Sequence, residues 1–259
     1  MLQVEHAEVS LQAFLQLGRR VFELPAPKRG LPGNPLSIPC SVVRLSAGRK
    51  RMRTLLVSEF VSLDGVIQAP GGPDEDRDGG FPHGGWMVPY ADEATGQAVQ
   101  YLHSQPFELL LGRRTYDIWT TYWPHVTENS PSRSIADVYN SVPKHVATHR
   151  PLEPTWSNSH ALGGDLVGAV RALKRPDGPN LLTWGSADVV RQLLAAGLVD
   201  ELHLQVFPVV LGRGKRLFGD DAKASAFTLT HSAATPGGVL ITRYVRNGEV
   251  RTGTLDDRE

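Results

Sequence analysis

The chain has 259 residues, of which 41% are hydrophobic and 21% charged, with 27 Lys and Arg against 27 Asp and Glu. This balance is typical of a folded globular protein and excludes a disordered chain. Equal charges give no general attraction to nucleic acid or acidic membranes, so any bound anion needs a local group of donors. The single cysteine, Cys40, excludes an internal disulfide and a Cys-x-x-Cys metal site.

Three regions are expected along the chain. Residues 1–51 combine Pro- and Gly-rich sequence with a basic end, and we interpret them as an N-terminal extension, disordered or created by an upstream start codon. A real regulatory or targeting arm is the alternative. Residues 52–247 would form one domain and residues 248–259 a frayed tail. No apolar run approaches the roughly 20 residues that span a bilayer, so no membrane association and a cytoplasmic location are expected.

From Met52 onward, strand-like and helix-like segments alternate, which predicts a sheet covered by helices. Strands are expected at residues 54–60, 107–111, 144–148, 180–184 and 201–210. Helices are expected at residues 94–104, 114–121, 166–173 and 186–196, the last capped by Ser186 and ended by Gly197. Residues 227–231 and 239–245 predict an antiparallel hairpin, so the fold class is α/β with a mixed, mostly parallel sheet.

The sharpest local motif is the end of the strand at residues 107–111, where apolar sequence runs into Gly112, Arg113, Arg114 and Thr115 at a helix start. Glycine lets the backbone approach a ligand, the first helical N–H groups point at it, and guanidinium groups bind phosphate with paired hydrogen bonds. This junction therefore predicts an anion site. The alternative is that both arginines are solvated or paired with carboxylates.

Two other strand ends carry similar groups. Gly185 and Ser186 join a strand to the best predicted helix, although a tight turn capped by Ser186 explains them as well, and Asp188 would disfavour a phosphate there. Residues 148–150 end another strand with hydroxyl, imidazole and guanidinium groups, which suit an extra phosphate such as that of NADPH. The junctions at residues 112–115 and 185–186 together suit a cofactor with a diphosphate.

These motifs also carry a family resemblance. Residues 112–116 resemble the Gly-Arg-x-Thr-aromatic cofactor motif of dihydrofolate reductases and of the reductase half of the bifunctional riboflavin-biosynthesis deaminase-reductase. Residues 57–65 resemble the first strand and Ser-x-Asp-Gly turn of the riboflavin reductases, and residues 198–218 resemble their late strand and following loop. The resemblance covers most of residues 52–246 and implies a three-layer dihydrofolate reductase-like fold, with helices on both faces of the sheet.

The resemblance implies an NADPH-dependent reductase of a pyrimidine- or pteridine-like small molecule, most like the 5-amino-6-(5-phosphoribosylamino)uracil reductase of riboflavin biosynthesis. Dihydrofolate reductase and a non-catalytic nucleotide-binding or regulatory protein are the alternatives, and the family's tendency toward dimers makes a homodimer plausible. Gly112, Arg113, Arg114 and Thr115 would contact the cofactor phosphates, and Gly185 and Ser186 would hold the pyrophosphate. Thr148, His149 and Arg150 would lie near the adenosine end and its 2′-phosphate.

Two carboxylates are candidate proton donors. Asp64 lies in the Ser-x-Asp-Gly turn, where the riboflavin-type reductases carry a substrate-facing aspartate, although Asp-Gly is also favoured turn chemistry. Asp92 resembles the helix carboxylate of dihydrofolate reductases, although an acid there also suits a helix N-terminus. Residues 69–86 are expected to form a substrate loop or lid, with a disordered insertion as the alternative, and Trp86 and Tyr90 could stack on a flat heterocycle.

No metal site is expected. The nine histidines show no ligand spacing, and there is no Gly-x-Ser-x-Gly elbow of a hydrolase. The acidic residues of the loop and the following turn lack the calcium-loop pattern and are expected to be a solvated segment: Asp74, Glu75, Asp76, Asp78 and Asp92. The zinc site of the riboflavin deaminase half needs more cysteines than the chain contains.

Overall fold

The computed structural model describes residues 52–130, 132–153, 155–175, 177–219 and 222–254. The expected N-terminal extension, residues 1–51, lies outside the described residues, as do residues 255–259 of the expected tail. The domain boundaries therefore stay predictions.

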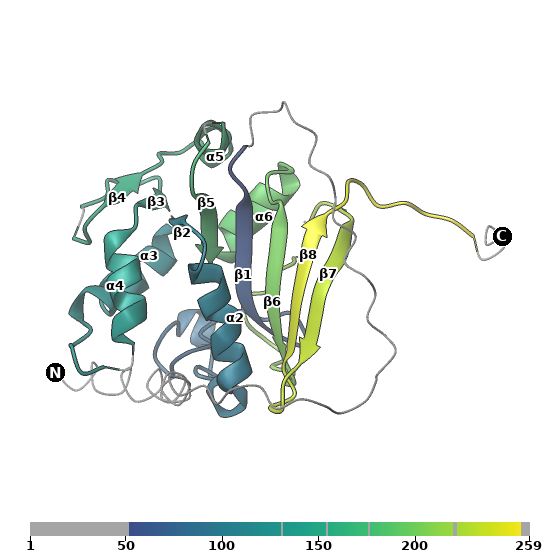
Figure 1. The fold of residues 1–259 in the computed structure, drawn as a ribbon, viewed down its shortest axis with the longest axis horizontal. Helices are drawn as coiled ribbons and strands as arrows, with labels where there is room; N and C mark the ends of the chain where they lie inside the picture. The colour runs from purple at the N-terminus through teal and green to yellow at the C-terminus, as the bar shows by residue number, and fades with distance from the viewer. Residues whose placement is uncertain (1–51, 131, 154, 176, 220–221, 255–259) are drawn as a thin grey trace, which may run out of the picture.

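In the described part of the chain, one sheet of eight strands has the order β4-β3-β2-β5-β1-β6-β8-β7 (Figure 1). Neighbours pair in parallel from β4 to β6, whereas β8 runs antiparallel to both β6 and β7. The strands are β1 Leu55–Ser62, β2 Phe107–Gly112, β3 Lys144–Ala147, β4 Ser159–Ala161, β5 Asn180–Trp184, β6 Glu201–Phe207, β7 Phe227–Ala234 and β8 Leu240–Arg246. The predicted mixed, mostly parallel sheet is confirmed.

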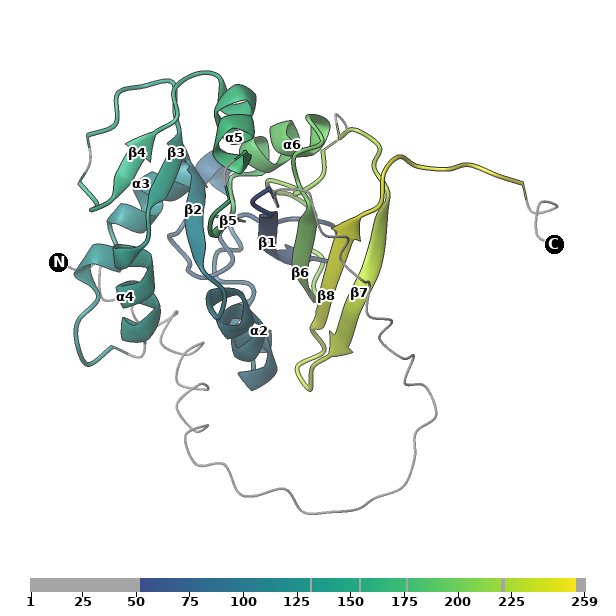
Figure 2. The ribbon, with the colours of Figure 1, turned by 45° about the horizontal axis from the view of Figure 1, so that its top comes forward.

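Helices cover both faces of this sheet (Figure 2). Along β1, Leu55 and Val57 belong to the apolar cluster under α5 and α6, while Leu56 belongs to the cluster under α2, α3 and α4. This alternation follows from the two-residue period of a strand and explains why a sheet buried on both faces reads as continuous apolar sequence. The helices are α2 Glu93–His103, α3 Arg113–Thr120, α4 Arg133–Ser141, α5 Leu166–Lys174 and α6 Ala187–Ala195.

Most elements begin and end close to where the sequence predicts them. Helix α6 ends before Gly197, which has a positive φ of 69° as expected for a glycine that terminates a helix. The prediction missed α4 and the short edge strand β4, and it extended β6 beyond its observed end at Phe207. The side-chain cap expected from Ser186 is also wrong, because this hydroxyl makes no capping hydrogen bond to α6.

The parallel strands bring several loops together at one edge of the sheet. Gly112 at the end of β2 lies beside Ala147 at the end of β3, and Ser58 in β1 lies beside Trp184 at the end of β5. Carboxyl ends of parallel strands share one edge, where ligands of open α/β sheets usually bind. The three predicted anion-binding junctions therefore leave the sheet from neighbouring strands.

Candidate functional site

A cavity of about 1090 Å³ lies at this edge of the sheet. Its walls come from the ends of β1, β2, β3 and β5, from the loop after β1 and from the segment before β7. Among the predicted cofactor residues, those that line it are Gly112, Arg113, Arg114, Thr115, Thr148, His149, Gly185 and Ser186. Arg150 is not among the lining residues, and its amide N–H donates to the hydroxyl of Thr148 at 3.1 Å.

The turn between β5 and α6 has an unusual backbone. Gly185 and Ser186 both have positive φ, 66° and 63°, and a serine in this region costs about 1–2 kcal/mol. Tertiary hydrogen bonds hold it: Ser186 Oγ accepts from the Gly112 amide at 3.0 Å and lies 2.6 Å from Thr115 Oγ1. The β2–α3 and β5–α6 turns are thus locked together, with the first residues of α6 on the cavity wall.

Arg113 connects the first junction to the third. Its Nε atom pairs with Asp117 Oδ1 at 2.7 Å, and its Nη1 atom donates to the Pro151 carbonyl at 3.1 Å. The guanidinium group therefore lies against the segment that follows Thr148 and His149. This contact joins the β2–α3 turn to the segment after β3 at the cavity wall.

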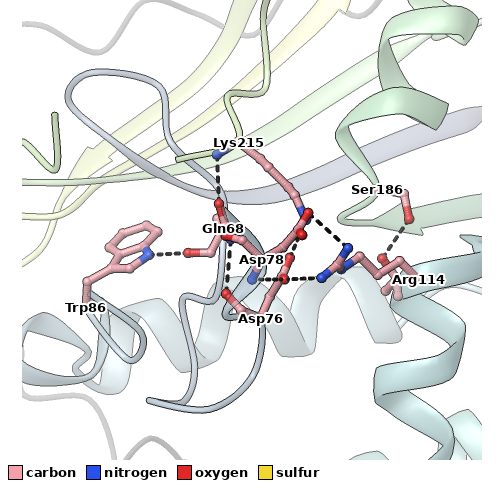
Figure 3. A network of polar contacts seen from close by, with 8 residues as sticks. Gln68, Asp76, Asp78, Trp86, Arg114, Ser186 and Lys215 are labelled. Atoms are coloured by element: carbon pink, nitrogen blue, oxygen red, sulfur yellow. Dashed lines mark hydrogen bonds and ion pairs between the residues drawn. The ribbon is translucent and has the colours of Figure 1, made fainter. Parts of the chain in front are cut away.

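Arg114 and Lys215 are engaged by acids of the loop after β1 (Figure 3). Asp76 lies 2.8 Å from Arg114 Nη2 and 2.7 Å from Lys215 Nζ, and Asp78 lies 3.0 Å from each cation. The hydrogen bond and charge of Lys215, with the charge of Arg114, lower the pKa of Asp78. The solvated-loop interpretation is wrong for Asp76, whose side chain is only 10% exposed.

Removing the Asp76 carboxylate is expected to make the cavity bind anions more tightly. Asp76→Asn releases part of the charge of Arg114 and Lys215, and we expect about threefold tighter binding of inorganic pyrophosphate at low salt, fading as salt screens the charges. Calorimetric titration at two ionic strengths measures this effect. The exposed Asp74, which pairs with Arg77, provides the matched control Asp74→Asn. Weaker binding in Asp76→Asn would mean that this ion pair holds the loop in its binding conformation.

Two of the other carboxyl groups that line the cavity have raised pKa values, and one of them is Glu59 in β1. Its side chain is buried in the sheet, Gly185 donates a backbone hydrogen bond to it, and its Oε1 atom has no partner among the described residues. Burial raises the pKa of Glu59 to about 8, with the Gly185 bond acting against that rise. At neutral pH this group is mainly a protonated acid beside the β5–α6 turn.

Glu75, in the loop after β1, is the second group. Its Oε2 atom accepts from the amides of Gly71 at 2.7 Å and Gly72 at 3.2 Å. Burial, opposed by these two bonds and helped by nearby Asp76, raises the pKa of Glu75 to about 7. The cavity lining has as many acidic as cationic side chains: Glu59, Glu75, Asp76, Asp78 and Asp188 against Arg113, Arg114, Arg191, Lys215 and Arg216. When Glu59 and Glu75 are both protonated, the net charge of the lining is positive.

Comparison with known proteins gives the family. Residues 53–241 match the family model described as the RibD C-terminal domain. The chain belongs to this family. A protein of Bacillus subtilis strain 168, described as uncharacterized protein YyaP, is 24% identical over 198 residues, which cover 76% of this chain and 97% of that protein.

Two solved structures share the fold of this RibD C-terminal domain. A putative riboflavin biosynthesis protein from Shewanella sp. PV-4 aligns with a TM-score of 0.50 and 21% identity, over 75% of this chain and 99% of that one. A pyrimidine reductase-like protein from Corynebacterium diphtheriae aligns with a TM-score of 0.53 and 15% identity, over 76% and 93% of the two chains. The expected three-layer architecture, a mixed sheet with helices on both faces, is confirmed.

In this RibD C-terminal domain, neither predicted proton donor lines the cavity. Asp64 accepts from the Ser62 hydroxyl and from the amides of Leu211 and Gly212. Although burial raises the pKa of Asp64, these bonds lower it to about 2, so this group is a poor proton donor near neutral pH. Its contacts brace the turn after β1 against the segment after β6.

Asp92 caps helix α2. Its side chain accepts from the Thr95 amide at 3.0 Å, Thr95 Oγ1 accepts from the Asp92 amide, and the Gly237 amide donates to Asp92 Oδ2 at 3.0 Å. Burial raises the pKa of Asp92, but the bonds from Gly237, Thr235 and Thr95 produce a net lowering. These contacts agree with the helix-capping alternative for Asp92.

The two aromatic residues expected to stack on a substrate also lie outside the cavity lining. Trp86 is buried, donates from Nε1 to the Gln68 carbonyl at 2.8 Å and packs edge-on against Phe207 (Figure 3). Tyr90 is partly buried against the apolar core. The aromatic side chains that do line the cavity are Phe60, Trp119, Trp184 and Phe218.

The sequence contained weak signals for the acids that it failed to identify. Glu59 is an acid inside an otherwise apolar strand, at a position where the two-residue period predicts burial. Glu75 was grouped with the solvated acids of its loop. Over the described ranges, no three His, Cys, Asp or Glu side chains form a group able to hold a metal ion, and no helix has the length and apolar character to cross a membrane.

Proposed function

We propose that this chain is an NADPH-dependent reductase of a small pyrimidine- or pteridine-like heterocycle. The observation that supports the proposal is the convergence of three strand-end junctions on one cavity, from residues far apart in sequence: Gly112 to Thr115, Thr148 with His149, and Gly185 with Ser186. Membership of a reductase domain family supports the reaction class. A cytoplasmic location and a homodimer stay predictions from the sequence.

The donors fit the parts of a dinucleotide. In the proposal, the start of α6 and the Gly185–Ser186 turn bind the pyrophosphate, with Gly112 and Thr115 holding the turn through Ser186. Arg113, Thr148 and His149 bind the 2′-phosphate. When bound, the reduced nicotinamide would supply a hydride, and the chain would position the two reactants and exclude water.

The riboflavin-pathway uracil reductase reaction is the specific form of this proposal suggested by the sequence resemblance. The dihydrofolate alternative depended on a pocket carboxylate at Asp92, and Asp92 instead caps α2 outside the cavity lining. A non-catalytic nucleotide-binding protein would bind NADPH without oxidising it. Absorbance assays of NADPH oxidation with uracil- and pteridine-type compounds distinguish these alternatives.

Arg113→Ala tests the cofactor assignment. We expect the wild-type protein to bind NADPH at least about tenfold tighter than NADH, and Arg113→Ala to lose most of this preference, because a charge-assisted bond to phosphate is worth about 1.5–3 kcal/mol. Calorimetric titration with both cofactors measures it.

Arg133 offers a closely matched control. It also pairs with an aspartate four residues later, Asp137, and donates to a backbone carbonyl, Val126, but it lies on α4 outside the cavity lining. Arg133→Ala should therefore bind both cofactors as the wild-type protein does. Equal wild-type affinities for NADPH and NADH, or an unchanged preference in Arg113→Ala, would contradict the assignment.

A further inference from the structure

A second, smaller pocket adjoins the large cavity. Its volume is about 110 Å³, and it shares with the cavity the wall residues Phe60, Pro70, Glu75, Trp119 and Trp184. A cavity on the order of 150 Å³ holds one benzene ring, so this smaller space, which adjoins the large cavity, has room for no more than a single ring. Its other walls are Gly71, Met87, Val99, Trp123, Ile135 and Tyr139.

Five aromatic side chains, packed against one another, form much of the wall: Phe60, Trp119, Trp123, Tyr139 and Trp184. Trp119 stacks on Tyr139 at 5.0 Å with an interplanar angle of 15°, and Trp123 packs edge-on against Tyr139 at 4.9 Å. Phe60 packs against Trp184 at 5.3 Å. None of the pocket's described lining residues is Lys, Arg or His, so a phosphate or carboxylate there would lie unpaired in apolar surroundings. The pocket therefore suits a flat, uncharged ring.

Two polar groups in this wall lack a full set of partners. The hydrogen bonds from Gly71 and Gly72 fix Oε2 of Glu75, which leaves Oε1 as the oxygen able to meet a ligand. The Trp184 Nε1–H group is buried and has no hydrogen-bond partner among the described residues. Because unpaired buried donors are costly, a ligand acceptor is the natural partner for this group.

We propose that this pocket binds the ring of the substrate, an uncharged planar nitrogen heterocycle whose ring nitrogen accepts a hydrogen bond from the Glu75 carboxyl group. The inference rests on the proposed function, since it locates the substrate ring beside the cavity assigned to the cofactor. It assigns substrate recognition to Glu75, Trp119 and Trp184, none of which the sequence singled out for this role.

The charged and titratable groups around Glu75 come from several elements. Asp76 in the same loop raises the pKa of Glu75, while Arg114 of α3 and Lys215 are engaged by Asp76 and Asp78. Burial raises the pKa of Tyr139 of α4, and its hydroxyl shares a hydrogen bond with His103 of α2. Burial lowers the pKa of His103 to about 4. Both are neutral near pH 7, so Glu75 is the pocket group that changes charge there, with Glu59 changing in the adjoining cavity.

The test uses 2-aminopyrimidine and aniline with the protein alone, in ligand-observed NMR titrations. Both probes are flat amines, but only 2-aminopyrimidine has ring nitrogen acceptors. We expect 2-aminopyrimidine to bind about tenfold tighter than aniline at about pH 6, and this preference to disappear at about pH 8.5, where the Glu75 carboxylate can no longer donate. Glu75→Gln keeps an amide donor but no titrating proton, so it should bind 2-aminopyrimidine without pH dependence.

Two further variants separate this pocket from other sites. Ile135 lines the small pocket only, and Ile135→Trp should block 2-aminopyrimidine, with folding checked by circular dichroism and NADPH titration. Glu59→Gln should keep the wild-type pH dependence. Equal binding of the two probes, unchanged pH dependence in Glu75→Gln, or undiminished binding in Ile135→Trp would overturn the inference. Because the probe titrations contain no cofactor, a failure here is distinguishable from failure of NADPH to bind.

Discussion

Gly112→Ala is expected to lose about 2–3 kcal/mol of folding free energy and at least about tenfold in NADPH affinity. A Cβ atom at Gly112 would lie 2.2 Å from Ser186 Oγ and 2.5 Å from Ser186 Cβ, closer than such atoms approach. The side chain of Ser186 would have to move, which breaks its bonds to the Gly112 amide and to Thr115. Denaturant unfolding and NADPH titration measure the two losses.

Gly96→Ala is the control for this substitution. Gly96 lies in helix α2, and a Cβ atom there would meet nothing within 4 Å. Alanine is the better helix former by about 1 kcal/mol, so this variant should be at least as stable as the wild-type protein. A Gly112→Ala variant with wild-type stability and affinity would show that the two turns are not held together as described.

Glu59→Gln is expected to make the protein more stable than wild type in alkaline solution. Burial raises the folded-state pKa of Glu59 from 4.5 to about 8, so the folded protein keeps a proton that the unfolded chain loses. The stabilisation is complete below about pH 4.5 and is lost as the pH rises through about 8. With one pKa unit worth about 1.4 kcal/mol, we expect a difference of about 2–4 kcal/mol, or roughly 5–10 °C in melting temperature, at about pH 9.

Melting temperatures measured from about pH 5 to pH 9 check this result. The gap between Glu59→Gln and wild type should widen as the pH rises, whereas the exposed Glu93→Gln should follow wild type throughout. NADPH affinity gives a second readout, because ionised Glu59 lies against the Gly185 amide and would repel a nearby pyrophosphate. A gap that stays constant with pH would mean that Glu59 has an ordinary pKa.

The sequence predicted those parts of the site that depend on local chain direction. An apolar strand that runs into glycine and donors predicts a junction at a strand end, and parallel strands bring such ends to one edge, which located Arg113, Thr148 and Gly185. The short edge strand β4 was missed because its three residues are too few to show a period. Helix α4 was missed although Ile135, Val138 and Tyr139 recur at helical spacing.

Side-chain roles that depend on tertiary contacts could not be predicted from the sequence. Ser186 has the residue type of a helix cap, but its positive φ and its bonds to Gly112 and Thr115 depend on a loop about 70 residues away. Trp86 and Trp119 are equally plausible as stacking residues in a sequence, and only packing shows that Trp86 is in the core while Trp119 lines the cavity. The same holds for Glu75, whose bonds from the Gly71 and Gly72 amides separate it from the exposed acids Asp74 and Asp78.

The central claim is that the ends of neighbouring strands form one site for a phosphorylated dinucleotide. A crystal structure of the protein with NADP⁺ tests it most directly. The account predicts that the pyrophosphate contacts the amides of the Gly185–Ser186 turn and α6, with the 2′-phosphate beside Arg113 and Thr148. A cofactor bound elsewhere on the molecule, or a cavity left without cofactor at saturating NADP⁺, would contradict it.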